Sequence, residues 1–215
     1  MAGSYSGRRI PALEGGGGTG ITLRAFRFNA AANHLMFAGR RGRVYDRIVV
    51  LNGVQPGDSV LGVGSSSGYL TGRLAAAAGP AGRVTGVDPS EPAIAYARRH
   101  APPGLTFTVG VAQDLRLPDA SFNVVTCTLA IHHIPARQRQ AAFAEMYRVT
   151  RPGGRLLTAD LAPLLHVSGR REPQATAADP LRDLAAAAGY QVDSAGQLPL
   201  LRYIVAVRPP RPDGA

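Results

Sequence analysis

The sequence predicts an α/β protein with a mostly parallel sheet and helices on both of its faces. Two observations lead to this class. Between residues 59 and 189, short apolar or β-branched runs alternate with segments whose apolar residues recur at helical spacing. In addition, 215 residues suffice for one well-buried domain but are few for two. Strands that alternate with helices in this way pair in parallel through right-handed crossovers.

Ahead of the first predicted strand, the chain changes from a polar arm to helical periodicity. Residues 1–22 are rich in glycine and polar residues, which predicts a flexible N-terminal arm. Apolar residues then recur at steps of three and four on both sides of Gly39, as at Ala31 and Leu35 before it. We therefore expect two helices within residues 23–54.

Turn residues and apolar runs define the remaining elements. The predicted strands are residues 59–64, 83–88, 105–110, 123–131, 155–160, 190–196 and 199–208. The predicted helices are residues 69–78, 91–100, 140–149 and 180–188. The RPGG segment at residues 151–154 predicts a turn before the fifth strand. The last two strands are close enough in sequence to pair antiparallel at the sheet edge.

All 24 basic residues are arginine, and much of the net charge of +10 lies at the N-terminus. Residues 1–56 carry eight arginines against two acidic residues, which accounts for +6. The basic residues are not interleaved with aromatic residues and no nucleic-acid motif is present, so we expect no nucleic-acid binding. Arg40, Arg43 and Arg47 share one helical face, which we interpret as solvated. An anionic substrate or an acidic membrane surface is the alternative.

Cysteine and histidine usage and hydropathy limit the remaining classes. Cys127 is the only cysteine, which excludes an intramolecular disulfide and a cysteine-based metal site. His34, His100 and His166 are scattered along the chain, so no histidine metal site is expected. The N-terminus has no apolar signal region, and no stretch reaches the roughly 18 apolar residues of a membrane span. We expect a soluble, cytoplasmic protein that does not insert into membranes.

The residues that end the predicted strands indicate a ligand site. In an open parallel sheet, ligands bind beyond the carboxyl ends of the strands. Gly64, Ser66 and Gly68 follow the first strand, and Asp88 ends the second, 24 residues after Gly64. In such an arrangement a glycine turn lets the backbone approach the ligand, while the carboxylate accepts both ribose hydroxyls. The turn alone is a weak signal, and the acid at this distance strengthens it.

Four segments, in order and at matching spacing, carry a family resemblance: VLGVGSSSGYLTGRLA, GRVTGVDPSEPAIAYARR, LPDASFNVVTCTLAIHHIP and AEMYRVTRPGGRLLTADL. They resemble the class I S-adenosylmethionine-dependent methyltransferases, especially the small-molecule, quinone-biosynthesis group, from about Phe26 to Leu161. The resemblance implies a Rossmann-like three-layer sandwich whose seven-stranded, mostly parallel sheet has an antiparallel last strand. It also implies S-adenosylmethionine as the cofactor and a single domain at residues 23–215. Within that domain, residues 23–54 would form a helical lid and residues 57–208 a Rossmann-like core.

Carried over position by position, the resemblance assigns residues to the cofactor. The turn after the first strand would line its methionine part, with Asp88 on the ribose and Pro89 against the adenine. Leu129, Ala130 and His132 would border the transferred methyl group. The expected cofactor-binding residues are Gly62, Gly64, Ser65, Ser66, Gly68, Asp88, Pro89, Val111, Ala112 and Leu129.

Departures from the family pattern concern charge and backbone freedom. The family usually has acids where this chain has Gly62 and Val111, a glycine in place of Ser66, and often an aspartate in place of Asn123. The acid missing at position 62 would bind the cofactor's ammonium group and contribute roughly 1.5–3 kcal/mol, and the adenine contact missing at position 111 about 1 kcal/mol. If both losses add, affinity falls by about two to three orders of magnitude. Ser66 avoids strain only if its φ is negative.

Two functions from different classes remain open. The first is methyl transfer from S-adenosylmethionine to a small-molecule acceptor in secondary metabolism or quinone-like biosynthesis. Much of the catalysis would come from holding the acceptor in line with an already activated methyl group. The second is a methyltransferase fold that has abandoned methyl transfer and serves as a cyclase, an isomerase or a ligand-binding partner in a biosynthetic pathway. The acceptor and the oligomeric state stay open, with a homodimer as one option.

Candidate acid–base residues follow the fourth predicted strand. His132 and His133 lie there at the expected mouth of the pocket, and a histidine suits the deprotonation of a phenol or enol acceptor. A structural hydrogen bond or a helix cap is the alternative role for this pair. Asp160 and Tyr45 are further candidates with weaker support.

Overall fold

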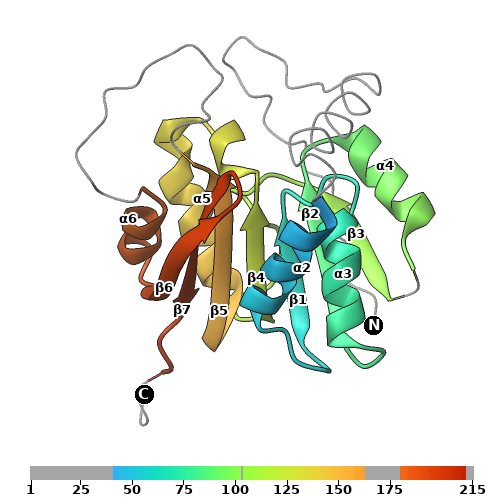
Figure 1. Cartoon of the computed structure of the whole chain (residues 1–215), viewed down its shortest axis with the longest axis horizontal. Coiled ribbons are helices and arrows are strands. Elements are labelled where there is room, and N and C mark those ends of the chain that lie inside the picture. Colours follow the sequence, from blue (N-terminus) through green and yellow to red (C-terminus); the bar gives the residue numbers. More distant parts are fainter. Residues whose placement is uncertain (1–40, 103, 163–179, 212–215) are drawn as a thin grey trace.

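The computed structural model describes residues 41–102, 104–162 and 180–211. Within them, seven strands form one sheet in the order β3-β2-β1-β4-β5-β7-β6, with helices on both faces (Figure 1). The strands are β1 (Ser59–Val63), β2 (Arg83–Asp88), β3 (Leu105–Val109), β4 (Phe122–Thr128), β5 (Thr150–Leu161), β6 (Gln191–Leu198) and β7 (Leu201–Val207). β1 to β5 are parallel and β7 is antiparallel to its neighbours β5 and β6, which confirms the predicted fold class.

Helices fill the two outer layers. They are α2 (Arg41–Asn52), α3 (Tyr69–Ala78), α4 (Glu91–His100), α5 (Ala136–Val149) and α6 (Pro180–Ala187), with a short 3-10 helix η1 (Ile131–His133) after β4. α2, α3 and α4 cover one face, where Leu74 of α3 packs with Val60 and Val84 of the sheet. α5 and α6 cover the other face, where Phe143 packs with Leu61. Because successive strand residues point to opposite faces, Val60 and Leu61 belong to different cores.

Local signals explain where α4 begins. The hydroxyl of Ser90 accepts a hydrogen bond from the backbone N–H of Ala93 at 3.4 Å, and Pro92 lies in the first turn. The last turn carries Arg98, Arg99 and His100, which suits the negative end of the helix dipole. The predicted helix at residues 91–100 is therefore confirmed, with its cap.

The predicted turn at residues 151–154 is wrong, because these residues lie within β5. β4 pairs with β5 on either side of them, so they form a bulge in the longer strand. The backbone of Arg208 holds this bulge, because Gly153 N–H donates to its carbonyl and its own N–H donates to the carbonyl of Gly154, each over 2.8 Å. A partner distant along the chain thus keeps a turn-like sequence in the sheet.

The fourth strand ends earlier than its apolar run, and the helix after it begins earlier. β4 stops at Thr128 instead of residue 131, because Leu129 has φ +55° and turns the chain into η1. α5 begins at Ala136 instead of residue 140. The residues after β4 therefore form a compact turn at the carboxyl end of the strand.

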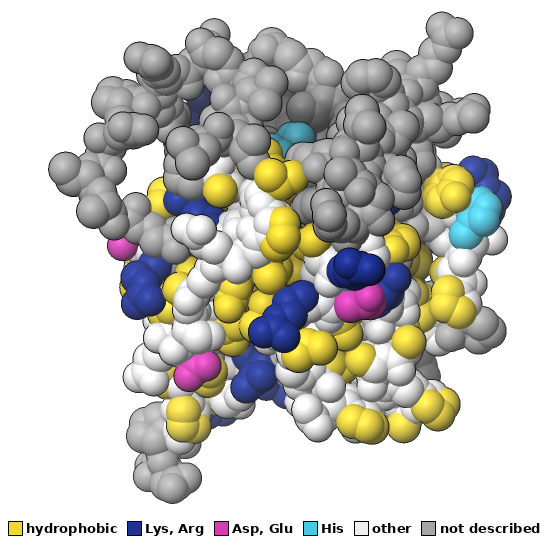
Figure 2. Space-filling model, in the orientation of Figure 1, with side chains coloured by type: hydrophobic (Ala, Val, Ile, Leu, Met, Phe, Trp, Pro, Cys, Tyr) yellow, Lys and Arg dark blue, Asp and Glu magenta, His cyan; other side chains and the backbone are white. Residues whose placement is uncertain are grey.

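α2 packs on the sheet with Val44 and Ile48 buried, while Arg43 and Arg47 are exposed. Figure 2 shows basic side chains gathered over the α2 and α3 part of this face, with an acidic side chain among them. The predicted arm at residues 1–22 and the first helix of the predicted lid lie outside the described residues. Among the helices described, none is long and apolar enough to cross a membrane.

Candidate active site

The turn after β1 is attached to β2 through its backbone. The N–H groups of Gly64 and Ser65 both donate to the carbonyl of Val87, over 2.8 and 3.0 Å. Gly64 has φ +70° and Gly68 has φ +79°, a left-handed conformation that glycine adopts without steric cost. The glycine turn predicted from the sequence thus lies at the carboxyl ends of β1 and β2, directly before α3.

Close packing also requires glycine at these two positions. A Cβ on Gly64 would overlap the Cβ of Ala130, which lies just beyond β4. A Cβ on Gly68 would lie 2.7 Å from Cζ of Phe107 in β3. Both separations are shorter than real Cβ atoms adopt, so Ala130 and the Phe107 ring leave no room for a side chain at these two positions.

Ser66 has a positive φ, which is the strained conformation for a serine. Its φ is +48°, and a left-handed backbone costs a non-glycine residue roughly 1–2 kcal/mol. The Ser66 N–H donates to Oδ2 of Asp88 at 2.8 Å, which helps hold this conformation. The adjacent Ser65 hydroxyl is buried and has no hydrogen-bond partner within the described residues. Such an atom is the kind of group that a bound ligand satisfies.

Asp88 ends β2 with its carboxylate held on both sides by backbone N–H groups. Oδ2 accepts from Ser66 and Oδ1 accepts from Ser90, over 2.8 and 2.9 Å, and 9% of the residue is exposed. Burial raises the pKa of Asp88 above its ordinary value, although the two hydrogen bonds act in the opposite direction. Because each carboxylate oxygen has a second acceptor site, two ligand hydroxyls can still donate to this group.

The residues expected around an adenine ring follow β2 and β3. Pro89 is exposed directly after Asp88, and Val111 and Ala112 are half-buried. The Gly110 N–H donates to the carbonyl of Asp88 at 3.1 Å, which brings the two segments together. The structure therefore places these predicted residues at one end of the glycine turn.

Gly62 lies buried in β1 and faces α3. A Cβ at this position would lie 3.0 Å from the hydroxyl oxygen of Thr71, a contact tighter than nearly all real Cβ contacts. Thr71 is itself 1% exposed. It therefore occupies part of the space that an acidic side chain at position 62 would need.

His132 and Asp160 form an ionisable pair between two neighbouring strand ends. The His132 Nδ1 lies 2.6 Å from Oδ1 of Asp160, and the His132 backbone N–H donates to Oδ2 at 2.9 Å. His132 belongs to η1 after β4, and Asp160 lies near the end of β5, which pairs with β4. The side chains are 23% and 6% exposed, respectively. The sequence suggested the two residues separately, and the fold joins them.

The charge of Asp160 determines which nitrogen of His132 carries the proton. Burial alone would raise the pKa of Asp160, but its hydrogen bonds to His132 and to the Leu161 N–H hold the pKa below its ordinary value. An ionised Asp160 only accepts hydrogen bonds, so Nδ1 carries the proton that points to it, and in a neutral imidazole Nε2 is then the acceptor. This is the arrangement of a general base with an orienting carboxylate.

His133 differs from its neighbour in its surroundings. It is exposed, and its ring centroid lies 3.9 Å from that of His132. Desolvation by nearby groups lowers the pKa of His133, and the charge that His132 can carry lowers it further. Asp160 raises this pKa by a smaller amount. Within the described residues, no carboxylate bonds His133, so the histidine that is oriented is His132.

Sequence reasoning missed an aromatic and arginine cluster beside the glycine turn. The guanidinium of Arg41 lies 4.2 Å from the ring centroid of Tyr69, and Arg73 Nη2 donates to the Tyr69 hydroxyl at 3.0 Å. Tyr45 packs edge-on against Tyr69 with centroids 5.2 Å apart, and its burial raises the pKa of the phenol. The Tyr45 phenol therefore stays protonated near neutral pH, which does not suit a general base. The only sequence signal for the cluster is the position of Tyr69 directly after the turn.

Comparisons with known proteins relate part of this chain to methyltransferases. Residues 60–154 match the methyltransferase domain family. A demethylmenaquinone methyltransferase of Symbiobacterium thermophilum is 35% identical over 132 residues, which are 59% of this chain and 52% of that protein. The chain thus spans about half the length of the curated relatives it matches.

Two examples illustrate the solved structures that share the fold. An S-adenosylmethionine-dependent methyltransferase from Aquifex aeolicus has a TM-score of 0.67 at 16% identity, over 87% of this chain and 98% of that one. The 4+2 cyclase SpnF has a TM-score of 0.64 at 18% identity, over 79% of this chain and 81% of that one.

Proposed function

We propose that this chain, which carries a class I S-adenosylmethionine-dependent methyltransferase domain, transfers a methyl group from S-adenosylmethionine to a small-molecule acceptor. The cofactor of this domain family is S-adenosylmethionine, in agreement with the resemblance in the sequence. The observation that carries the proposal is the position of Asp88. Its carboxylate lies beside the glycine turn at the end of β2, bonded by the turn's own backbone and able to accept two ribose hydroxyls.

The residues present fit most of the cofactor but not its ammonium group. Asp88 has free acceptor sites, and the buried hydroxyl of Ser65 lacks a partner within the described residues. Position 62 carries no carboxylate, and Thr71 occupies part of the space beside it. We propose that the cofactor is held by Gly64, Ser65, Ser66, Gly68 and Asp88, with Pro89, Val111 and Ala112 near the adenine and Leu129 near the methyl group.

The chain's own residues would hold the acceptor and take its proton. When bound, S-adenosylmethionine supplies a methyl group that its positive sulfur has already activated. His132 accepts the acceptor's proton at Nε2, and Asp160 stabilises the imidazolium that results. His132 is thus the proposed catalytic residue and Asp160 a positioning residue. His133, the other histidine suggested by the sequence, stacks on His132 without an orienting carboxylate.

The base also suggests the kind of acceptor. A neutral imidazole is basic enough to deprotonate a phenol or an enol, whose proton is far more acidic than that of an aliphatic alcohol. The relative in Symbiobacterium thermophilum is, by its name, a methyltransferase for demethylmenaquinone. Both points support a quinone-like acceptor for this chain, in a biosynthetic role.

The absence of an acidic residue at position 62 favours a second function. Thr71 crowds the place where the family's acid would bind the cofactor's ammonium, and Val111 lacks the acid expected beside the adenine. A protein that kept the fold and rebuilt the pocket for another ligand would show these changes. It would act as a cyclase, an isomerase or a ligand-binding partner.

Calorimetry with S-adenosylmethionine separates the two functions. We expect binding by the wild type and an affinity about tenfold to hundredfold lower for Asp88→Ala, since a charge-assisted contact is lost. Asp193→Ala, at an exposed aspartate of β6, is the matched control and should bind normally. An Asp88→Ala protein that binds like the wild type, or a wild type that does not bind, contradicts the proposal.

The role of His132 is tested by methyl transfer to a panel of phenolic and hydroquinone acceptors. His132→Ala should lower turnover while cofactor affinity stays unchanged, and His133→Ala should affect turnover less. Normal turnover in His132→Ala would return that residue to a structural role.

A further inference from the structure

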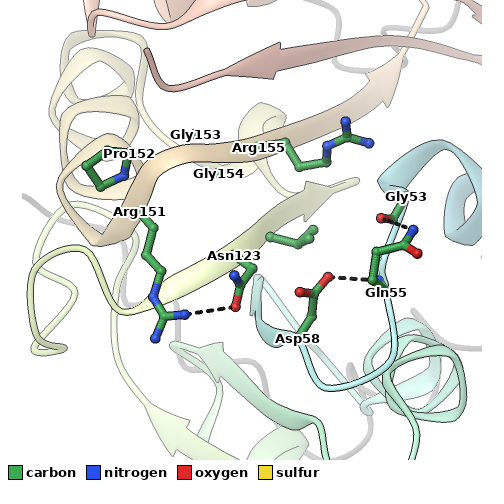
Figure 3. A pocket seen from close by; sticks show the side chains of 10 residues that line it. Gly53, Gln55, Asp58, Asn123, Arg151, Pro152, Gly153, Gly154 and Arg155 are labelled. Carbon is green, nitrogen blue, oxygen red and sulfur yellow. Dashed lines mark hydrogen bonds between the residues drawn. The ribbon is translucent and has the colours of Figure 1, made fainter. Parts of the chain in front are cut away.

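A groove lies at the amino ends of the strands, at the end of the sheet opposite the candidate active site. It has a volume of about 410 Å³ and runs between the end of α2, the start of β4 and the bulge of β5 (Figure 3). Its polar lining consists of Gln55, Asp58, Asn123, Arg151 and Arg155. The volume lies within the range of small-molecule sites, and the active-site proposal does not use this groove.

Arg155 brings a positive charge without a counter-charge to the groove. Its side chain is half-buried, and no group among the residues described forms a hydrogen bond or ion pair with its guanidinium. The guanidinium lies against the backbone of Gly53, where a Cβ would overlap Nη1. Gly53 has φ +61°, so the end of α2 both needs glycine for its turn and leaves room for this cation.

Asn123 holds Arg151 while its own amide donors remain available. The Asn123 Oδ1 accepts from the backbone N–H of Ser59 at 2.9 Å. It also accepts from Arg151 Nη1 at 3.2 Å, the bond drawn in Figure 3. Two donors on Oδ1 set the orientation of the amide, so Nδ2 is the atom turned away from both. No acceptor in the described part of the chain bonds Nδ2. An aspartate here would offset the charge of Arg151, whereas the amide leaves it positive.

Asp58 does not neutralise the two arginines. Its Oδ2 accepts the backbone N–H of Gln55 at 2.8 Å, which closes the turn before β1, and it forms no ion pair with a described arginine. The formal charges of the lining, from Arg151, Arg155 and Asp58, leave an excess of +1. A ligand that complements the groove must therefore bring oxygen acceptors and negative charge.

We propose that this groove binds a small molecule through an oxyanion group, a phosphate or a carboxylate. The planar guanidinium of Arg155 presents paired N–H donors, a geometry that matches both kinds of oxyanion. Arg151 and Asn123 line the same groove and bring further N–H donors to it. Because the groove and the candidate active site lie at opposite ends of the strands, both can be occupied at once.

Two-dimensional NMR of the full chain tests the proposal. Inorganic phosphate and, separately, malonate are titrated at constant ionic strength, with the amide signals of Gly53, Gly153 and Gly154 as reporters. We expect saturable shifts of these glycine signals with at least one anion. The anion that binds more tightly identifies the class of oxyanion. No saturable shift with either anion overturns the proposal.

Variants locate the binding. Asn123→Asp keeps the side-chain shape and the acceptor for Ser59 but adds a negative charge, so affinity should fall by about tenfold or more. Gln140→Glu makes the same amide-to-acid change at an exposed residue of α5, which lines no part of the groove, and should leave affinity unchanged. If Asn123→Asp fails to fold, Arg155→Met tests the same anion binding by removing the guanidinium. Wild-type affinity in Asn123→Asp or in Arg155→Met overturns the proposal.

Discussion

A carboxylate introduced at position 62 tests whether the turn after β1 faces the cofactor's ammonium group. Gly62 pairs with Gly86 of β2 and Thr126 of β4, and the Cβ of a new side chain would lie 3.0 Å from the Thr71 hydroxyl oxygen. Gly62→Asp therefore adds both volume and charge. Gly62→Asn adds nearly the same volume without the charge, so the difference between the two variants isolates the electrostatic effect.

Volume and charge act in opposite directions once the cofactor is bound. Overpacking against Thr71 costs about 1–3 kcal/mol of unfolding free energy, and a buried carboxylate without a partner costs about 1–3 kcal/mol more. In a chain of this size each kcal/mol lowers the melting temperature by about 2–4 °C. An ammonium group beside the carboxylate would instead contribute about 1.5–3 kcal/mol to binding, a gain of roughly tenfold to hundredfold in affinity.

Calorimetry and melting curves measure both effects. Each variant at position 62 is combined with Thr71→Ala, which removes the hydroxyl that crowds the site. We expect Gly62→Asp/Thr71→Ala to bind S-adenosylmethionine at least about tenfold more tightly than Gly62→Asn/Thr71→Ala. Without cofactor, the aspartate variant should melt lower than the asparagine variant, and saturating cofactor should reverse that order.

Equal affinities of the aspartate and asparagine variants would refute this reasoning, since no cation of the cofactor would then lie opposite residue 62. If the aspartate variant loses stability and binds no cofactor in either background, and the wild type binds none either, methyl transfer itself is contradicted. The pocket would then belong to a different ligand, as in the second function considered above.

Four further changes are expected to give defined results. Val111→Asp should tighten cofactor binding in calorimetry by about 1 kcal/mol, and a loss of affinity would contradict the adenine assignment. Ser66→Gly should raise the melting temperature, because it relieves about 1 kcal/mol of strain at φ +48°, and a lower melting temperature would mean that the hydroxyl is needed. Gly64→Ala should cost about 2–4 kcal/mol in urea unfolding, and Ala130→Gly should recover part of that loss by removing the overlap; no recovery would argue against the overlap. Asp160→Asn should be less stable than the wild type at pH 7. The pKa of Asp160 is lowered in the folded protein, so its charge stabilises the fold at any pH above the ordinary pKa of an aspartate, and this contribution is lost as the pH falls below that pKa. The gap in urea unfolding should therefore narrow toward pH 3, and a constant gap would contradict the charge assignment.

Elements defined by local signals could be predicted from the sequence. β2 and α4 lie where the sequence places them, because Asp88 ends an apolar run and Ser90 caps the helix that follows. Turns and caps act over a few residues, so a linear reading finds them. The glycine turn was predictable for the same reason, together with the acid that follows it at the end of β2.

Features that depend on distant contacts could not be predicted from the sequence. His132 and Asp160 are separated by 28 residues, and only the pairing of β4 with β5 brings them together. The φ of Ser66 depends on how the turn is packed, and the sequence leaves its sign open. The sequence at residues 151–154 reads as a turn, because nothing local shows that the backbone of Arg208 will pair with it.

The position of β7 has a consequence for how the chain folds during synthesis. β7 lies between β5 and β6, although it follows both in sequence, and it supplies the hydrogen-bonding partner of each. Until residues 201–207 have left the ribosome, one side of β5 presents unpaired N–H and C=O groups. Open strand edges of this kind pair with other chains. The nascent protein can therefore associate through this edge until β7 pairs with β5, and a truncation before residue 201 leaves the edge open.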